Sequence, residues 1–188
     1  SNQINTETSE RLIRYLVKHQ HWSPLEMVNA CLEIETTRDI AHQIVRHRSF
    51  AFQEFSQRYA NPEEQGDMFE YSEARLQDTK NRQNSIETSD VELQAWWDAQ
   101  QKFVTEISKK IYDEALKKGI AKEQARKVLP EGLTKTKLYM NGSLRSWIHY
   151  IELRSANGTQ KEHMEIAHAC AKVIAGIFPL MSELQQGE

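Results

Sequence analysis

The sequence has few cysteines and lacks any long hydrophobic run. Its 188 residues include two cysteines, Cys31 and Cys170, which are too few and too far apart for a disulfide framework or a thiolate metal site. No apolar run approaches the ~20 residues needed to cross a bilayer. The opening SNQINTETSE has neither the basic nor the apolar region of a signal peptide. We therefore expect a cytoplasmic protein in a reducing compartment, without a membrane partner.

An excess of positive charge is also absent. The chain has 24 basic and 27 acidic residues, and its formal net charge is −3. Nucleic-acid-binding proteins usually carry a basic excess or patch, whereas the basic residues here are not confined to one helix or tail. The length suits one hydrophobic core. We expect a single domain over residues 1–188 that does not bind nucleic acid.

The spacing of apolar residues predicts an α+β fold that is predominantly helical, with a small, mainly antiparallel sheet. Strands are expected at residues 28–35 and 133–140, and NGS at 141–143 is expected to be a turn. Residues 60–89 are polar and predict a long, mobile connection with a brief strand around Phe69 and Tyr71. Helices are expected at 9–19, 37–45, 90–118, 121–128, 143–154 and 159–177, with one helical turn at 23–26. Capping boxes are expected at Ser23 with Glu26 and at Thr159 with Glu162.

The longest expected helix, at residues 90–118, begins after Ser89 or Asp90 and ends at Gly119. At ~1.5 Å per residue it spans about 40 Å, which is long for a domain of this size. We therefore expect it to pack against other subunits as well as its own core. The apolar residues at helical intervals along it are Trp96, Phe103, Val104, Ile107, Ile111, Ala115 and Leu116.

Charge is concentrated in RHRSFAFQEFSQRY, residues 46–59. The part EFSQR is predicted to be extended, so that Glu54, Ser56 and Arg58 lie along one side. Guanidinium groups suit phosphate because their planar fork donates hydrogen bonds in pairs. Basic residues recur near the expected ends of elements, at Arg46, Arg48, Arg58, Arg126, Arg145 and Arg154.

Other uses of these residues remain open. Any one arginine, taken alone, is more often a scattered surface charge. A metal site built from His19, His21, His42 and His47 is disfavoured, because residues 42 and 47 do not share a helix face and no Cys or Asp completes a set. We expect no metal.

The triplet Arg46-His47-Arg48, followed by seven residues and Ser56, resembles the signature of the flavin-dependent thymidylate synthases. The resemblance continues in HWSPLE at 21–26, in Gln43, in Glu54 to Tyr59, in ARKVLP at 125–130 and in GSLRSWIHYIELR at 142–154. It covers most of the chain in order. The chain is therefore identified as similar to this family.

The resemblance implies a homotetramer with sites at subunit interfaces. It implies reductive methylation of dUMP to dTMP, with 5,10-methylenetetrahydrofolate as carbon donor and FAD reduced by NADPH as hydride source. The other class of thymidylate synthase needs a cysteine nucleophile, and neither Cys31 in a strand nor Cys170 in an apolar helix face lies beside an activating base. A flavin hydride route needs no such thiol.

Residue roles also follow from the resemblance. The dUMP-binding positions are Gln43, Arg46, Glu54, Ser56, Arg58, Arg126 and Arg154, of which Ser56 and Arg154 are expected to be catalytic. The positions that border FAD are Ser23, Glu26, His47, Arg48, Ser49, Arg145 and His149. His21 is expected on the folate and NADPH side, and one of Gln160, Lys161 or His163 is expected at the flavin.

Two departures from the family pattern leave alternatives open. The N-terminal strand with its alanine-arginine-x-serine stretch is missing, so we expect an N-terminally truncated domain. Ser143 and His149 stand where other members carry asparagine. The alternative function is a catalytically inactive nucleotide- or RNA-binding helical protein that uses the same arginines.

Overall fold

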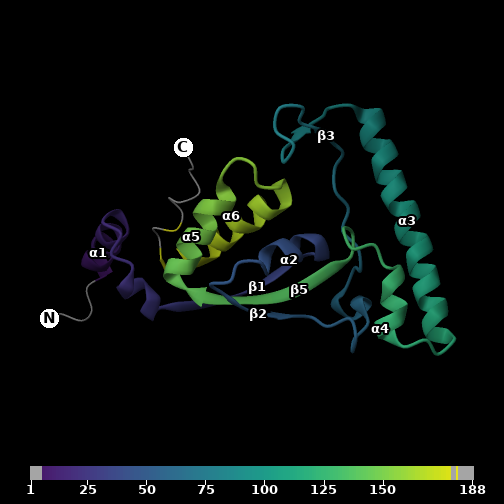
Figure 1. Ribbon diagram of the computed structural model, residues 1–188, viewed down its shortest axis with the longest axis horizontal. Helices are drawn as coiled ribbons and strands as arrows, with labels where there is room; N and C mark the ends of the chain where they lie inside the picture. The colour runs from purple at the N-terminus through teal and green to yellow at the C-terminus, as the bar shows by residue number, and fades with distance from the viewer. Residues whose placement is uncertain (1–5, 179–180, 182–188) are drawn as a thin grey trace. The chain divides into compact units, whose positions relative to one another are not determined.

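The computed structural model describes residues 6–178 and residue 181 (Figure 1). The helices are α1 Thr6–Lys18, α2 Arg38–Ile44, α3 Val91–Lys117, α4 Lys122–Ala125, α5 Leu144–Ser155 and α6 Lys161–Ala175. Short 3-10 helices are η1 Ser23–Met27, η2 Pro62–Gln65 and η3 Arg126–Val128. The strands are β1 Asn29–Thr37, β2 Ala51–Glu54, β3 Arg75–Gln77, β4 Ser85–Glu87 and β5 Lys135–Ser143. In the described part of the chain, no helix is long and apolar enough to cross a membrane.

The chain divides into two compact units. Unit 1 contains the described residues up to Leu32, residues 47–52 and the described residues from Tyr139 onward. Unit 2 contains residues 33–46 and 53–138. The predicted α+β class with a small antiparallel sheet is confirmed.

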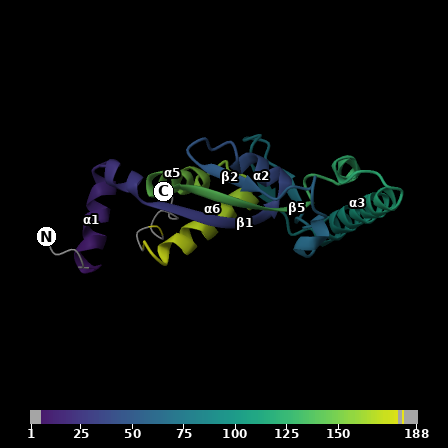
Figure 2. The same ribbon diagram turned by 90° about the horizontal axis from the view of Figure 1, so that it is seen from below.

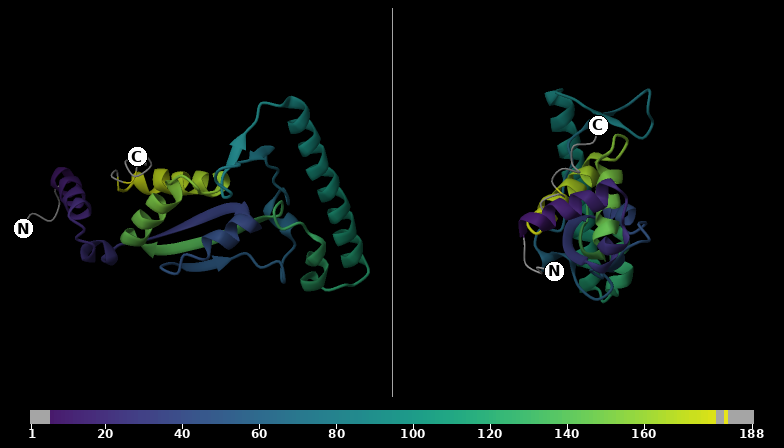
Figure 3. Two further views of the ribbon diagram at one scale, coloured as in Figure 1. Left: turned by 45° about the horizontal axis from the view of Figure 1, so that its top comes forward. Right: turned by 90° about the vertical axis from the view of Figure 1, so that its left-hand side faces the viewer.

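The main sheet has the strand order β1-β5-β2, and β5 runs alongside β1 (Figures 2 and 3). At one end the Leu144 N–H donates to the Val28 carbonyl at 2.7 Å, and at the other the Arg38 N–H donates to the Thr134 carbonyl at 2.9 Å. The start of β1 thus lies beside the end of β5, and the end of β1 beside the start of β5, so the two strands are antiparallel. Burial alternates along β1 as predicted, with Ile34 and Thr36 buried.

Unit 1 is built around α5 and α6, which lie side by side (Figures 1 and 2). The indole of Trp147 is fully buried, and its Nε1 donates to the carbonyl of Ala30 at 3.0 Å. The ring of Phe50 meets the Trp147 ring edge-on at a centroid distance of 4.9 Å. Other buried side chains of the two helices are Leu144, Ile148, Tyr150, Ile151, His163, Ala167, Cys170, Ala171 and Ile174.

Unit 2 is dominated by α3, a single continuous helix (Figure 3). Its N-cap is Asp90, whose side chain accepts from the Leu93 N–H at 3.0 Å, and it ends before Gly119. Gly119 has φ +80°, a conformation that glycine adopts without steric cost. The limits predicted for this helix are therefore confirmed.

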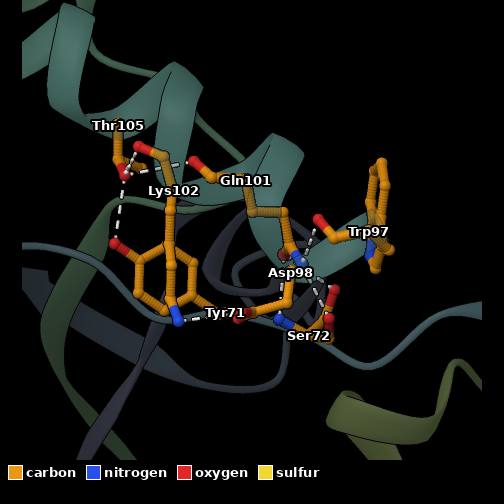
Figure 4. Close-up of polar contacts among 7 residues, drawn as sticks. All are labelled: Tyr71, Ser72, Trp97, Asp98, Gln101, Lys102 and Thr105. Atoms are coloured by element: carbon orange, nitrogen blue, oxygen red, sulfur yellow. Dashed lines mark hydrogen bonds and ion pairs between the residues drawn. The ribbon is translucent and has the colours of Figure 1, made fainter. Parts of the chain in front are cut away.

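Two of the three buried residues of α3, Gln101 and Thr105, are polar, and both contact the segment 71–72 (Figure 4). Gln101 donates to the carbonyl of Ser72 at 2.8 Å and accepts from its N–H at 3.0 Å. The hydroxyl of Tyr71 lies 3.0 Å from that of Thr105. These bonds attach the segment 71–72 to the helix, and further along Tyr112 packs with Met68 and Ala125 in a small apolar core.

The predicted apolar face of α3 does not face the core of its own chain. Trp96 is 57% exposed and Phe103 60%, and Val104, Ile107 and Ile111 are also exposed. Of the seven apolar residues expected at helical intervals, only Ala115 and Leu116 pack against the small core around Tyr112. Packing of the other five against further subunits stays a prediction. Val173 and Ile177 were expected on the inward side of the last helix, and Val45 on the apolar stripe of the helix at 37–45, but all three are exposed.

Two local predictions fail because the backbone follows another course than the sequence pattern indicated. The strand predicted at 54–58 ends at Glu54, and residues 57–59 form a turn in which the Tyr59 N–H donates to the Ser56 carbonyl at 3.1 Å. Gln57 is buried in that turn, so Glu54, Ser56 and Arg58 do not line one strand edge. Asn141 to Ser143 continue β5 instead of forming a turn.

The capping boxes and the connection 60–89 also differ from expectation. Neither η1 nor α6 has a side-chain N-cap hydrogen bond, so the capping boxes predicted at Ser23 and Thr159 are wrong. Within the polar connection, β3 and β4 form an antiparallel hairpin in which Leu76 faces Ile86. The brief strand predicted near Phe69 is a single antiparallel bridge to Thr134.

Candidate functional site

Glu26 is the centre of one cluster of predicted flavin-site residues in unit 1. The Arg145 Nη1 lies 2.7 Å from Glu26 Oε1, and the Ser143 hydroxyl donates to Glu26 Oε2 at 3.0 Å. The hydrogen bond from Arg145, reinforced by that from Ser143, lowers the pKa of the Glu26 carboxyl. Glu26 was predicted to cap its own helix. Instead it accepts a hydrogen bond from Arg145, which lies 119 positions further along the chain.

Two aromatic side chains adjoin this ion pair. The guanidinium of Arg145 lies 6.0 Å from the centroid of the Trp22 ring, within the range of a cation–π contact. The same ring is 4.7 Å from the imidazole of His149. The sequence HWSPLE is thereby joined to α5, so the structure brings Glu26, Arg145 and His149 together.

An open cleft of about 650 Å³ lies beside this cluster in unit 1. Four of its lining residues were predicted, namely Glu26, Ser49, Arg145 and His149. Sequence reasoning missed the others, which are Asn29, Ala51, Asn141, Gly142 and Ser146, and Ser143 was noted only as a departure. Asn141 and Gly142 were overlooked because NGS was interpreted as a turn. Amide, hydroxyl and guanidinium donors in one cleft suit the oxygens and nitrogens of a flavin nucleotide.

The remaining residues of the predicted flavin and folate side lie apart from the lining of this cleft. Ser23 begins η1 and is exposed, and Arg48 is exposed between α2 and β2. The ring of His21 is stacked parallel to Tyr15, at a centroid distance of 6.1 Å.

One of Gln160, Lys161 and His163 was expected at the flavin, and of these three His163 is fully buried. Its imidazole bonds the Tyr150 hydroxyl at 3.1 Å, so only Gln160 and Lys161 present surface to a ligand.

His47 is half-buried and contacts Arg154 of α5. The Arg154 Nε donates to His47 Nε2 at 2.9 Å. Burial, with the nearby Arg154 charge as a second cause, lowers the pKa of His47 to about 4. His47 is therefore neutral near pH 7, which is the state that accepts a hydrogen bond at Nε2.

Six of the seven predicted nucleotide residues lie in unit 2, and Arg154 lies in unit 1. Glu54 accepts from Arg38 at 3.2 Å and from the Thr136 hydroxyl at 2.9 Å. Arg58 pairs with Glu123 at 3.5 Å. Arg38 was missed, because no sequence pattern links it to Glu54, which lies 16 positions further along the chain.

The other nucleotide residues lie at or near the ends of elements, as predicted for Arg46 and Arg126. Gln43 lies in the last turn of α2, and its carbonyl accepts from the Arg46 N–H at 3.4 Å. Arg46 is exposed, and Arg126 begins η3. Ser56 follows the end of β2 and is half-buried. Among the described residues, no group of three or more His, Cys, Asp or Glu side chains is placed to hold a metal ion.

Comparison with known proteins gives a consistent result. The family model described as "Thymidylate synthase complementing protein" matches residues 1–180. A probable flavin-dependent thymidylate synthase of Paramecium bursaria Chlorella virus 1 is 48% identical over 182 residues, which cover 97% of this chain and 82% of that protein. The flavin-dependent thymidylate synthase of Synechocystis is 51% identical over 172 residues, 92% and 78% of the two chains.

A solved structure is also similar to this chain. The UMP/dUMP methylase PolB from Streptomyces cacaoi, crystallised with 5-Br dUMP, superposes with a TM-score of 0.80 at 25% identity. The match covers 96% of this chain and 81% of that one. With a family match across both units and relatives near 50% identity, the chain belongs to the flavin-dependent thymidylate synthase family.

Proposed function

We propose that this chain carries out the reaction of its family, the reductive methylation of dUMP to dTMP. The carbon donor is 5,10-methylenetetrahydrofolate, and FAD recharged by NADPH supplies the hydride when it is bound. The family match over residues 1–180 is the observation that carries this conclusion. It also favours the enzyme over an inactive nucleotide- or RNA-binding protein.

The unit 1 cleft is the proposed flavin site. Its support is the convergence of Arg145, Ser49 and His149 on one cleft from two distant segments of the chain. The ion pair with Glu26 fixes the guanidinium of Arg145 at the cleft, and the chain's own role there is to bind and orient the cofactor. Ser23, Arg48 and His21 stay predictions from the family pattern.

The proposed nucleotide residues are arginines and acceptors at the ends of elements. Arg58, Arg126 and Arg154 suit the phosphate and base because each offers a planar fork of donors. Ser56 orients the uracil, and Glu54, held by Arg38 and Thr136, presents an acceptor of fixed position. Contributions come from more than one subunit of the assembly.

A homotetramer is proposed for that assembly, and the exposed apolar residues of α3 support it. Successive residues turn by 100°, so Trp96, Phe103, Val104, Ile107 and Ile111 share one side of the helix, away from the buried Gln101 and Thr105. Large apolar groups gathered on one exposed side are typical of a subunit interface. The free thiols Cys31 and Cys170 support the further prediction of a cytoplasmic location.

Tritium release from C5-labelled dUMP tests the reaction, with NADPH and the folate supplied. We expect yellow protein that bleaches with NADPH and releases tritium. Arg154→Ala should weaken dUMP binding by about 2 to 4 kcal/mol, because it removes a charged, partly buried contact. Arg82→Ala, an exposed arginine beside β4, is the matched control. Colourless protein that binds dUMP without turnover would instead support the inactive binding protein.

Light scattering tests the assembly. Ile107→Lys places a charge in the exposed apolar side of α3 and should dissociate the tetramer. Glu106→Lys introduces the same side chain one position away, on another side of the helix, and should leave the tetramer intact. A tetramer that survives Ile107→Lys would exclude α3 as its interface.

A further inference from the structure

Arg154, which is assigned to dUMP, also donates a hydrogen bond to a side chain of its own unit. Its side-chain bond to His47 uses Nε, the nitrogen nearest the helix, at 2.9 Å. A guanidinium has five N–H donors, and the Nε bond occupies one of them. The four N–H groups of the terminal nitrogens are the pair-wise fork that binds phosphate or a pyrimidine edge. The contact with His47 therefore orients the arginine without occupying its fork.

The imidazole of His47 has to be neutral for this contact. Because Nε2 accepts the bond, the ring proton resides on Nδ1. A protonated ring would place a cation and a donor against the guanidinium. The half-buried position of the ring and the adjacent positive charge both favour the neutral form.

The ring itself is held by buried neighbours. Tyr150 meets it edge-on at a centroid distance of 4.9 Å, and His163 lies 6.2 Å away in a similar orientation. Tyr150 and His163 are both buried and are bonded to each other at 3.1 Å. Since these two side chains are fixed from α5 and α6, their contacts restrict the orientation of the imidazole beside Arg154.

We propose that His47 is a positioning residue for the nucleotide, acting through Arg154: it accepts the Nε proton and so aims the terminal guanidinium nitrogens at dUMP. This role differs from a direct contact with the flavin. It rests on the proposed assignment of Arg154 to dUMP. It also explains why a histidine, with an acceptor at the far end of a rigid ring, suits the middle position of the arginine-histidine-arginine triplet.

A pair of variants tests the role of the acceptor. His47→Gln places its amide oxygen near the position of Nε2, whereas the shorter side chain of His47→Asn falls short of Arg154. Titration calorimetry of the holoenzyme with dUMP should show affinity within a few-fold of wild type for Gln and roughly tenfold weaker for Asn. Flavin absorbance and the melting temperature are measured on the same samples. Equal losses in the two variants would overturn the proposal.

A double-variant cycle separates the two assignments. If His47 acts through Arg154, adding His47→Phe to Arg154→Ala should not weaken dUMP binding further, although His47→Phe alone does. Additive losses would refute positioning while leaving Arg154 a nucleotide residue. Unchanged dUMP affinity in Arg154→Ala alone would instead refute the nucleotide assignment. If the phenylalanine variant is unstable, the same cycle is run with His47→Asn.

Discussion

Helices α5 and α3 treat their large side chains in opposite ways. In α5 of unit 1, Trp147, Ile148 and Tyr150 are buried, and the polar atom of each aromatic group finds a partner within the unit. In α3 of unit 2, the buried positions Gln101 and Thr105 are polar, and large apolar residues are exposed. The large side chains Trp147, Ile148 and Tyr150 of α5 are therefore packed within one chain, whereas α3 has apolar surface suited to another copy.

The largest difference is expected between two tryptophans. Trp147→Ala removes a fully buried indole and should lower the free energy of unfolding by about 3 to 5 kcal/mol. Trp96→Ala, in the exposed side of α3, should change the stability of a protomer far less and should act on assembly instead. Urea unfolding at a fixed protein concentration measures the first effect, and sedimentation the second. Similar unfolding losses for both would remove the contrast between the helices.

Two glycines offer the next test. A Cβ on Gly142 would lie 2.4 and 2.6 Å from ring atoms of Phe50, and that ring is itself packed on Trp147. Gly142→Ala should therefore destabilise unit 1 by roughly 1 to 3 kcal/mol. At Gly132 of unit 2 a Cβ meets nothing within 4 Å, so Gly132→Ala should have little effect. Thermal unfolding compares them, and an unaffected Gly142→Ala would mean that Phe50 moves freely.

Acid should weaken unit 1 through His163. Desolvation, with the charges of Arg154 and His47 as lesser causes, lowers the pKa of His163 to about 3, against about 6.5 in an unfolded chain. Between these values the unfolded state binds a proton that the native state does not. The free energy of unfolding should therefore fall as the pH falls below 6.5, with a slope approaching 1.4 kcal/mol per pH unit.

The variant His163→Gln removes this titration and retains a group that can bond Tyr150. Its unfolding free energy should depend less steeply on pH between about 6.5 and 5.5 than that of the wild type. His47, whose pKa is lowered for the same principal reason, accounts for part of the remaining slope. Denaturation curves recorded at half-unit intervals of pH measure both slopes. Equal slopes would show that His163 is accessible to protons in the native state.

The contrast between the helices also shows what sequence patterns can reveal. The ends of α3 were predictable, because Asp90 and Gly119 act locally on the backbone. Periodicity found the apolar side of the same helix but could not tell what covers it, since that depends on distant parts of the chain or on another copy. The strand predicted at 54–58 was wrong because β2 ends at Glu54 and residues 57–59 form a turn, in which the Tyr59 N–H donates to the Ser56 carbonyl.

The candidate site was predictable to a similar extent. The spaced triplet and Ser56 identified the family, and the family match confirmed it. The bonds of Arg145 to Glu26 and of Arg154 to His47 join residues more than 100 positions apart. No local pattern predicts such pairs, so Glu26 was assigned a local cap, and Arg38, Asn141 and Ser146 were missed. Local chemistry is readable from sequence, whereas long-range partners need the fold.

The smallest expected change in stability comes from the N-caps. Both α3 and α5 begin with a residue whose side chain accepts a backbone N–H. Asp90→Ala removes the acceptor for the Leu93 N–H and should lower stability by about 1 kcal/mol, and Asp90→Asn should retain most of it. Ser143 accepts from the Ser146 N–H at 3.3 Å and also donates to Glu26. Ser143→Ala should therefore lower flavin content as well as stability, because it also loosens a residue that lines the cleft.

Flavin absorbance per protomer, measured beside thermal unfolding, separates the two caps. Asp90→Ala should keep its flavin, since in unit 2 that cap serves only the helix. Equal flavin loss in both variants would mean that α3 contributes to the cofactor site through assembly. The same cap chemistry then has different consequences, because one acceptor is shared with the proposed flavin site and the other is not.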